Sequence, residues 1–310
     1  MTMHTLAPLR VGVIGAGRVG AVLGAALATS GHQVVAASAV STASRDRVAR
    51  LLPTARLLAA DEVILRADLI LLAVPDDILT DLVHGLAESG SFRPGQIVVH
   101  TSGAHGLAVL APAVERGVLP LALHPVMTFA GRPEDVQRLA GAPFGVTANE
   151  EHRAVAETLV LEMGGEPVWV DESARTLYHA ALVVGSNHLI TLVAEAQDLL
   201  RTAGVEDPAR LLAPLLGAAL DNSLRYGDKA LTGPVSRGDI GTVRRHLRTL
   251  VEHAPSSVAS YVAMARRTAQ RALAVGRLKR HEAAPLLDLL AERPAPAQAK
   301  AGPANAPVAT

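Results

Sequence analysis

The sequence predicts an α/β fold: a doubly wound, parallel sheet in the first half of the chain, followed by an all-α domain. Up to about residue 170, short apolar segments alternate with amphipathic helical segments, and after it apolar residues recur only at helical spacing. Several of the short segments are apolar at every position, as is typical of parallel strands covered on both faces. The length of 310 residues suffices for two domains.

The first domain is expected at residues 1–170, with strands and helices in alternation. The predicted strands are 9–14, 33–39, 69–74, 97–100, 119–124, 143–147 and 167–170. The predicted helices are 19–30, 44–51, 78–89, 106–116 and 150–163. Gly164 follows the last of these helices, as a glycine that ends a helix commonly does.

The second domain is expected at residues 171–293 and is predicted to be helical throughout. Its predicted helices are 173–203, 208–224, 240–254, 257–275 and 281–292. Asp207-Pro208 is typical of a helix start, with a capping carboxylate followed by proline in the first turn. Residues 294–310 are rich in Pro, Ala and Gly without apolar periodicity, so we expect a disordered tail.

Composition excludes several classes of protein. Lys+Arg and Asp+Glu are both 29 and aromatic residues are 2%, so neither attraction to phosphates nor base stacking favours a nucleic-acid partner. Cysteine is absent from the sequence, which excludes disulfides and thiolate chemistry and fits a reducing compartment. Residues 1–10 are too few and too polar for a signal peptide, and no unbroken apolar run approaches the roughly 20 residues of a membrane span. We therefore expect a soluble, cytoplasmic protein with no membrane partner.

A glycine-rich loop follows the first predicted strand and opens the first predicted helix. Its sequence is Gly15-Ala16-Gly17-Arg18-Val19-Gly20, the G-x-G-x-x-G pattern in the context that its mechanism requires. Gly15 permits a tight turn, Gly17 lets a pyrophosphate approach the backbone, and Gly20 lets helix and strand pack closely. The sequence therefore predicts a Rossmann-type dinucleotide site.

The end of the second predicted strand favours NADP over NAD. NAD sites usually place an acidic residue there, but residues 36–45 hold no carboxylate. Ser41, Ser44 and Arg45 instead suit a ribose 2′-phosphate, and Arg18 adds a second positive charge. The alternative is that Arg45 and Arg47 only begin a solvated helix.

Val74-Pro75-Asp76-Asp77 follows the strand at 69–74, at the carboxyl edge where sheets of this class bind ligands. We expect Val74, Pro75 and Asp76 to line the nicotinamide-ribose side of the site. The alternative is that the two carboxylates only cap the following helix.

Two further segments end predicted strands at the same edge. They are His100-Thr101-Ser102-Gly103-Ala104 and the segment from His124 to Phe129, and they bring Ser102 and His124 toward the expected cofactor as substrate-binding candidates. Two histidines without a third ligand at suitable spacing do not indicate a metal site, so none is predicted.

The first helix of the second domain carries polar residues on one face. His179, Ser186 and Asn187 share that face within an otherwise apolar segment. Reduction of a carbonyl needs a proton donor and a group that holds the oxygen, which are roles for His179 and Asn187. The alternative is that both are hydrogen-bonded polar groups that join the domains.

A loop between later helices contains Thr232-Gly233-Pro234 and, after two residues, Arg237-Gly238-Asp239. Arg237 is a candidate clamp for a substrate carboxylate, and Asp239 either orients it or caps the helix that follows. Equally, the loop is a rigid connection in which Arg237 and Asp239 form a local ion pair.

These motifs, together with Tyr178-His179-Ala180-Ala181 between them, resemble in their order the Rossmann-like family whose helical half is the domain of unknown function DUF2520. The resemblance covers about residues 9–290. More distantly, the chain is similar to the superfamily of β-hydroxyacid dehydrogenases, ketopantoate reductases and pyrroline-5-carboxylate reductases. That similarity implies an NAD(P)-dependent oxidoreductase and, with the small residues of the C-terminal helices, a homodimer.

The chain departs from this pattern at one position. Hydroxyacid dehydrogenases and ketopantoate reductases use a lysine on the interdomain helix, followed by an asparagine. The lysines here are Lys229, Lys279 and Lys300, none of them on that helix. Asn187 matches the asparagine, and His179 has to replace the lysine.

Three functional hypotheses follow. In the leading one, the enzyme transfers a hydride from NADPH to a small 2-keto acid, or runs in reverse, with ketopantoate as the first candidate; Ser102 and Asn187 position the oxygen and Arg237 holds the carboxylate. The second is an imine reductase of the pyrroline-5-carboxylate reductase type, in which an already protonated imine needs no strong acid. The third is a non-catalytic NADP-binding sensor or partner protein.

Overall fold

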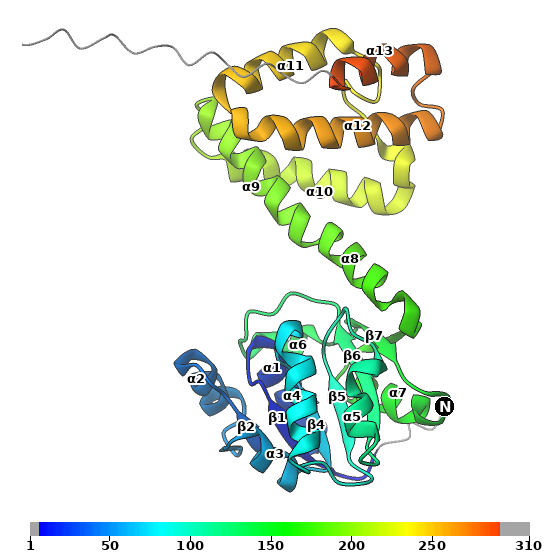
Figure 1. Cartoon of the computed structure of the whole chain (residues 1–310). Helices are drawn as coiled ribbons and strands as arrows, with labels where there is room; N and C mark the ends of the chain where they lie inside the picture. The colour runs from blue at the N-terminus through cyan, green and yellow to red at the C-terminus, as the bar shows by residue number, and fades with distance from the viewer. Residues whose placement is uncertain (1–5, 292–310) are drawn as a thin grey trace, which may run out of the picture. The chain divides into compact units, whose positions relative to one another are not determined.

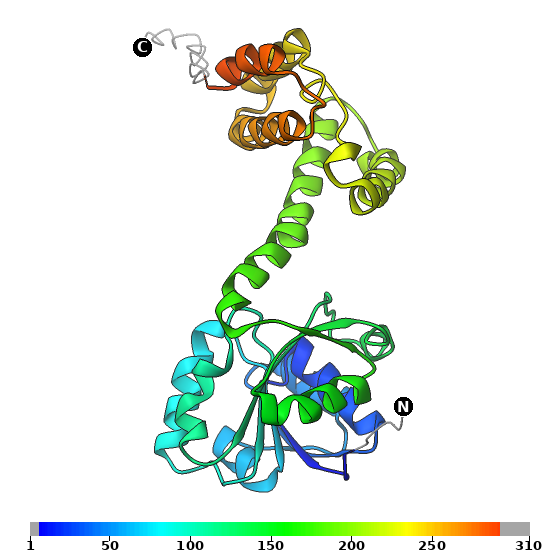
Figure 2. The ribbon, with the colours of Figure 1, turned by 90° about the vertical axis from the view of Figure 1, so that its right-hand side faces the viewer.

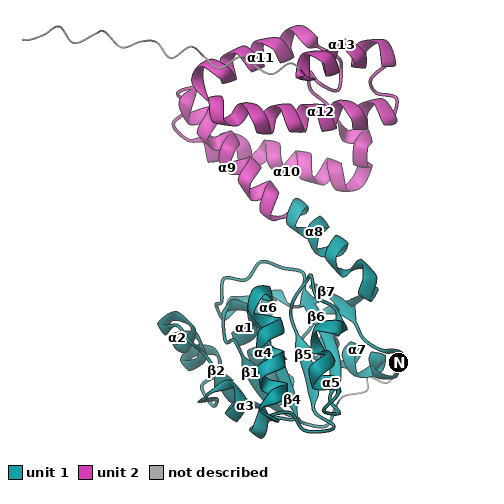
Figure 3. Cartoon of the chain, in the orientation of Figure 1, with its two compact units in different colours: residues 1–185 teal, residues 186–310 magenta. Residues whose placement is uncertain are grey.

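The computed structural model describes residues 6–291 (Figure 1). The chain divides into two compact units, residues 1–185 and 186–310, shown in two colours in Figure 3. The expected tail at 294–310, and the end of the last predicted helix at residue 292, lie outside the described residues.

An eight-stranded sheet forms the centre of the first unit, in the order β3-β2-β1-β4-β5-β6-β7-β8. All neighbouring pairs are parallel except β6 and β7, which are antiparallel. The fold class is confirmed, and this one antiparallel pair is a correction to the all-parallel expectation. Its cause is the connection after β6, which carries only one short helix and stays at the same edge of the sheet. The strands are β1 (Arg10–Ile14), β2 (Gln33–Ser38), β3 (Arg56–Leu57), β4 (Leu69–Leu72), β5 (Ile97–His100), β6 (Leu119–Pro125), β7 (Pro143–Thr147) and β8 (Glu166–Trp169).

Helices cover both faces of the sheet, as Figures 1 and 2 show. Side chains alternate along each strand: Leu69 and Leu71 enter the core under one face, whereas Ile70 and Leu72 enter the core under the other. The first core is closed by α1 (Arg18–Thr29), α2 (Thr42–Leu51), α6 (Glu134–Arg138) and α7 (Arg153–Glu162). The second core is closed by α3 (Ala60–Arg66), α4 (Asp76–Glu88), the 3₁₀ turn Leu107–Leu110 and α5 (Ala111–Val114).

The short elements β3, α3 and α6 are not among the elements that the sequence predicts. The single helices predicted at 106–116 and 150–163 each begin as a 3₁₀ turn, the second at Glu150–His152. Elements this short have little periodicity of their own, and their pairing with the rest of the unit decides their conformation.

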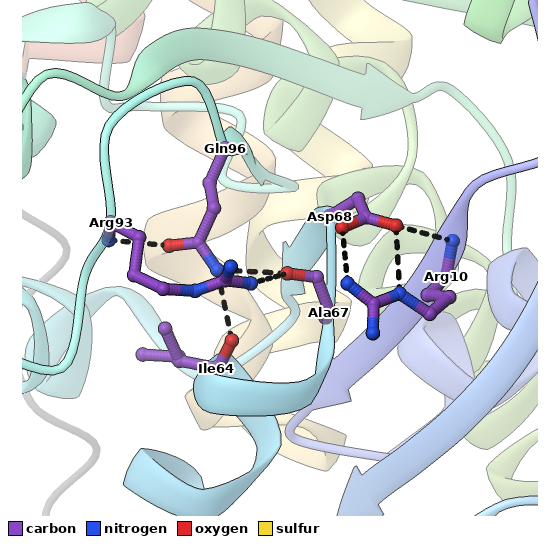
Figure 4. A network of polar contacts seen from close by, with 6 residues as sticks. All are labelled: Arg10, Ile64, Ala67, Asp68, Arg93 and Gln96. Carbon is purple, nitrogen blue, oxygen red and sulfur yellow. Dashed lines mark hydrogen bonds and ion pairs between the residues drawn. The ribbon is translucent and has the colours of Figure 1, made fainter.

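A polar network ties the amino edge of the sheet together (Figure 4). The Asp68 carboxylate accepts hydrogen bonds from Arg10 Nε at 3.0 Å and Arg10 Nη2 at 2.8 Å. The side chain of Gln96 donates to the carbonyls of Ile64 and Ala67 at 2.9 and 2.8 Å. The hydrogen bond from Arg10 lowers the pKa of Asp68. The loops of the candidate site, described below, lie at the opposite, carboxyl edge of the sheet.

The second unit is helical. Its core lies between α11 (Ile240–His253), α12 (Val258–Ala274) and α13 (Arg280–Ala291). The two helices that precede them are α9 (Asn187–Thr202) and α10 (Pro208–Tyr226). The predicted start of α10 is confirmed, because Asp207 accepts a hydrogen bond from the Arg210 backbone at 3.1 Å.

The single helix expected at 173–203 consists of a 3₁₀ turn (Glu172–Ala174), α8 (Arg175–Gly185) and α9, with an irregular residue, Ser186, between the two helices. The units divide after Gly185, whereas the expected domain boundary was residue 170, and α8 therefore belongs to the first unit.

Within the described chain, the stretch Glu172–Thr202 is by length and composition apolar enough to cross a membrane, at mean hydropathy 1.4. It was not expected because scattered polar residues interrupt every long apolar run.

Candidate functional site

The glycine loop joins β1 to α1 with the geometry that the sequence predicts. Gly15 has a φ of +84°, which favours glycine, and Gly17 caps α1. A Cβ on Gly20 would collide with the Gly15 carbonyl oxygen and come within 2.9 Å of the Ala73 Cβ. A Cβ on Gly17 would meet nothing closer than 3.9 Å. Gly20 is thus required by packing, whereas the space beside Gly17 is open to a ligand.

A pocket of about 920 Å³ opens over this loop. It lies where the strand order reverses between β1 and β4, the position at which folds of this class bind dinucleotides. The glycine loop and the free N–H groups at the start of α1 suit a pyrophosphate. The lining includes most of the predicted cofactor residues: Gly15, Ala16, Gly17, Arg18, Ser41, Ser44, Arg45, Val74 and Pro75.

Three arginines line the end of the pocket where α2 begins. They are Arg18, Arg45 and Arg47, and none of them forms an ion pair within residues 6–291. Arg47 was not among the predicted cofactor residues. A Cβ on Gly131 would lie 2.7 Å from Arg47 Nε and 3.2 Å from Arg18 Cγ, so the loop after β6 packs against both side chains. This cluster of unpaired guanidinium groups suits a phosphate.

Ser41 and Ser44 shape the start of α2. The Ser41 hydroxyl accepts a hydrogen bond from the Ser44 backbone at 3.1 Å, and the Ser44 hydroxyl donates to the Ser41 carbonyl at 2.7 Å. Ser44 is buried. Its hydroxyl therefore holds the first turn of α2, while exposed Ser41 faces the pocket as a helix cap.

Val74 and Pro75 line the pocket, and α4 begins at Asp76. Neither Asp76 nor Asp77 caps this helix through a side-chain hydrogen bond, so the capping alternative has no support. Both carboxylates lie in the first turn, where the helix dipole stabilises negative charge.

A second cluster of functional groups lies at the carboxyl edge of the sheet, where α8 meets β6 and β7. The Tyr178 hydroxyl lies 2.9 Å from His124 Nδ1, and the His124 ring makes edge contacts with both Tyr178 and His179, at centroid distances of 5.7 and 5.9 Å. Gly103 and Gly145 make room for these rings, because a Cβ on Gly103 would meet His179 and one on Gly145 would meet Tyr178.

Tyr178 belongs to the motif Tyr178-His179-Ala180-Ala181, but the sequence predicts no role for it. Its neighbour His179 is the predicted acid, and the structure brings His179 together with His124, another predicted residue. Burial raises the pKa of Tyr178, and burial, followed by the charge of Arg175, lowers the pKa of His124 to about 4. At neutral pH the pair is therefore a neutral hydroxyl beside a neutral imidazole.

Arg175 is the buried cation behind this cluster, with 1% of its surface exposed. It donates hydrogen bonds to the carbonyls of Ser102, His105 at 2.9 Å and Gly145 at 3.0 Å. Burial lowers its pKa. Arg175 thus holds the loop after β5 against β7, a role that sequence reasoning missed because an arginine at a helix start is usually solvated.

The loop after β5 is held from inside as well. His100 is fully buried, and burial lowers its pKa to about 3; its Nε2 lies 2.9 Å from the Gly106 carbonyl oxygen. The Ser102 hydroxyl accepts hydrogen bonds from the backbones of Ala104 and His105 at 3.2 and 3.0 Å. Ser102 therefore keeps its hydroxyl proton for a further partner.

The remaining predicted residues belong to the second unit. Ser186 and the exposed Asn187 stand at the start of α9. Arg237 is exposed in the loop before α11, and Asp239 caps that helix by accepting from the Thr242 backbone at 3.0 Å. The capping alternative is thus the one observed for Asp239. Within residues 6–291, no group of three or more His, Asp or Glu side chains could hold a metal ion.

Comparisons with known proteins agree with the two-part organisation. Residues 3–125 match the Rossmann-like domain, and residues 142–268 match the domain of unknown function DUF2520. A search of curated proteins found no significant match.

Solved structures of similar fold include an NADP oxidoreductase candidate, an imine reductase and a reductive aminase. A candidate NADP oxidoreductase from Bacteroides fragilis is 22% identical, with a TM-score of 0.71 over 85% of this chain and 98% of the other. An imine reductase from Pseudomonas sp. is 20% identical, with a TM-score of 0.62 over 87% and 99%. A reductive aminase from Aspergillus terreus, solved in complex with NADPH, is 17% identical, with a TM-score of 0.57 over 92% and 93%. At these identities the likeness establishes the fold.

Proposed function

We propose that this chain, which joins a Rossmann-like domain to a DUF2520 domain, is an NADPH-dependent reductase of C=N bonds. The observation that carries the proposal is the cluster of Tyr178, His124 and His179, which offers a neutral hydroxyl and imidazoles where related carbonyl reductases use a lysine. Bound NADPH supplies the hydride. A protonated imine that accepts a hydride becomes a neutral amine, so no strong acid has to deliver a proton in that step.

The similarity to imine reductases supports this choice over the 2-keto acid hypothesis. Reduction of a carbonyl generates an alkoxide that must take up a proton, whereas hydride transfer to a protonated imine leaves a neutral amine. Reduction of ketopantoate stays a prediction for the same assay.

In the proposed reaction, the glycine loop and α1 bind the pyrophosphate, and Val74 and Pro75 border the nicotinamide ribose. The Tyr178 hydroxyl donates to His124 Nδ1, at 2.9 Å, and its oxygen accepts a hydrogen bond from the N–H of the protonated imine. Ser102 offers a second hydroxyl. His179 as an acid, Ser186 and Asn187 as positioning groups, and Arg237 as a carboxylate clamp stay predictions.

The test is oxidation of NADPH by the purified chain with a cyclic imine, ketopantoate and other 2-keto acids as substrates. We expect turnover with the imine. Tyr178→Phe should lower kcat about 100-fold while the Kd for NADPH is kept. Tyr226→Phe is the matched control, because Tyr226 is an exposed tyrosine of the second unit. Turnover with 2-keto acids alone contradicts the proposal, and tight NADPH binding without any turnover favours the sensor hypothesis.

The preference for NADPH rests on the arginine cluster. We expect Arg45→Ala and Arg47→Ala each to weaken NADPH binding about tenfold and to leave NADH binding unchanged, because only NADPH carries the 2′-phosphate. Arg50→Ala is the control on the same helix, since Arg50 does not line the pocket. Equal losses of affinity for NADPH and NADH would show that the arginines contact a part that both nucleotides share.

We also propose a homodimer in which the second unit buries exposed leucines of α10. Leu211, Leu215, Leu220 and Leu224 are each more than half exposed. Exposed apolar side chains in this number on one helix commonly mark an interface. Sedimentation at micromolar concentration should show a dimer, and the soluble cytoplasmic fraction should contain it. A monomer, or a chain that partitions into membranes through Glu172–Thr202, would contradict this proposal.

A further inference from the structure

The helical unit contains a pocket of its own, formed entirely by residues of that unit. Its volume is about 410 Å³, within the range of small-molecule sites. It lies between α9, the loop before α11, and α12, and its walls are mostly apolar, with Leu192, Leu199 and Ala265 among them. The two units hold separate pockets, because no residue of the nucleotide pocket belongs to this one.

One carboxylate, that of Glu195, lines this pocket. Its Oε1 accepts a hydrogen bond from the Ser260 hydroxyl at 2.6 Å, and the Ser257 carbonyl, at 3.0 Å, shares the same proton. No Lys or Arg lines the pocket, and no ion pair to Glu195 occurs within residues 6–291. The carboxylate is half-buried and faces a mostly apolar cavity that holds no lysine or arginine to pair with it.

The other polar groups of the pocket include the pair His246 and Tyr261. His246 Nδ1 lies 2.9 Å from the Tyr261 hydroxyl, and the two rings make an edge contact. Burial raises the pKa of Tyr261, so the hydroxyl stays protonated at neutral pH. Glu195 is consequently the acidic group that sets the charge of the site.

We propose that this pocket binds a small organic amine as its ammonium cation, with the charge on Glu195 and the hydrocarbon part against the leucines of α9. A positively charged nitrogen completes the hydrogen bonding of the carboxylate, and an apolar body displaces water from the walls. An anion is excluded by the charge of Glu195, and a neutral apolar ligand leaves that charge without a partner. This site is separate from the proposed reductase activity. The two are related in one way, because amines are the products of C=N reduction.

The experiment is calorimetric titration of the full chain, without nucleotide, with cyclohexylamine hydrochloride at neutral pH and with cyclohexanol as the neutral analogue. We expect saturable binding of the amine and at least tenfold weaker binding of the alcohol. Glu195→Gln keeps the size of the side chain and an acceptor for Ser260 but removes the charge, so it should weaken amine binding at least tenfold. Glu206→Gln, at an exposed acid of the same unit outside the pocket, should leave it unchanged.

Equal affinity of the native chain and Glu195→Gln for the amine overturns the proposal, as does an absence of saturable binding by a native chain that still binds NADPH. Thermal unfolding of each variant shows whether it is folded. Should Glu195→Gln fail to fold, Ser260→Ala tests the same site, with an expected loss of several-fold in amine affinity. Because no nucleotide or turnover enters the titration, this outcome is independent of the reductase assay.

Discussion

The two units differ in what covers their apolar side chains. In the first unit, strand residues such as Leu71 and Val98 lie between two layers of helices and are buried. In the second unit, α11, α12 and α13 enclose a core, but α10 leaves Leu215 and Leu224 at 61% and 79% exposure. A parallel sheet covered on both faces completes its own core, whereas a helix with apolar residues around much of its circumference needs a further partner.

The units also differ in their buried charge and polar groups. The first unit buries His100, the Arg175 guanidinium and Asp135, whereas the buried polar groups of the second unit, within the described chain, are the hydroxyls of Ser236 and Ser257. Stability of the first unit should therefore depend on pH and on individual polar contacts. The stability of the second unit should depend on its association with a second copy of the chain.

The largest expected difference is in acid sensitivity. His100 and His124 have folded pKa values of about 3 and about 4, below the ordinary value of 6.5, so between pH 6.5 and 4 the unfolded chain binds protons that the folded unit does not. Stability of the first unit therefore falls as the pH falls through this window. One pKa unit is worth about 1.4 kcal/mol, so the two histidines together amount to several kcal/mol.

Hydrogen exchange at pH 7 and pH 5, read separately for peptides of each unit, measures this effect. The slow amides of the first unit should lose more protection than those of the second. His124→Asn should reduce the pH dependence, and His84→Asn, at an exposed position of α4, should not. Equal losses in both units would show that these histidines do not govern acid stability.

The second prediction concerns the exposed leucines of α10. Leu215→Glu should weaken dimerisation more than 100-fold, because a symmetric interface places the new charge in apolar surroundings twice. Leu65→Glu, at a leucine of α3 that is 55% exposed, is the control in the first unit. Sedimentation equilibrium gives both constants, and a dimer that survives the α10 change places the interface elsewhere.

The third prediction addresses the buried cation. Arg175→Met should lower the free energy of unfolding by about 2–4 kcal/mol, because the carbonyls of Ser102, His105 and Gly145 lose their donor. Arg153→Met removes a half-buried guanidinium that stacks on Trp169 at 3.9 Å, and should cost less than about 1 kcal/mol. Urea denaturation followed by the fluorescence of Trp169, the single tryptophan, reports on this unit. Similar losses of unfolding free energy for both variants would show that the hydrogen bonds of Arg175 do not contribute specially to stability.

The smallest expected effects separate packing from binding within the glycine loop. Gly20→Ala should cost about 1–3 kcal/mol, since its Cβ would meet the Gly15 carbonyl and Ala73. Gly17→Ala should leave stability unchanged and weaken NADPH binding, because its Cβ would enter the open space above the loop. Gly85→Ala, in α4 with no atom within 4 Å, should change neither property by more than about 1 kcal/mol. Thermal unfolding and NADPH titration test all three, and a loss of stability in Gly17→Ala would contradict the distinction.

Much of the fold was predictable because its signals are local. The strands at Ile97–His100 and Pro143–Thr147 have the predicted bounds, since each is a short apolar run between polar turns. The glycine loop was predictable because its turn and its close packing depend on the absence of a Cβ at particular positions. Helix starts with a capping carboxylate, such as Asp207, likewise depend on neighbours in sequence.

The candidate site was only partly predictable. A strand end and a helix face identify His124 and His179 as candidates, but the sequence predicts no role for Tyr178, Arg175 or Arg47. Each of these three acquires its role from residues far away in the chain, as Tyr178 does from His124. An arginine followed by apolar residues has the same local pattern whether its guanidinium reaches water or three buried carbonyls.

By itself, then, the sequence determined the order of the longer strands and helices, the glycine-rich turn and the change from sheet to helices, because periodicity and missing side chains act over a few residues. The tertiary structure decided the antiparallel entry of β7, the burial of Arg175, the pairing of Tyr178 with His124 and the solitary carboxylate of Glu195. These depend on which distant groups meet, and the free energy of a buried polar group is set by its partners rather than by its position in the sequence.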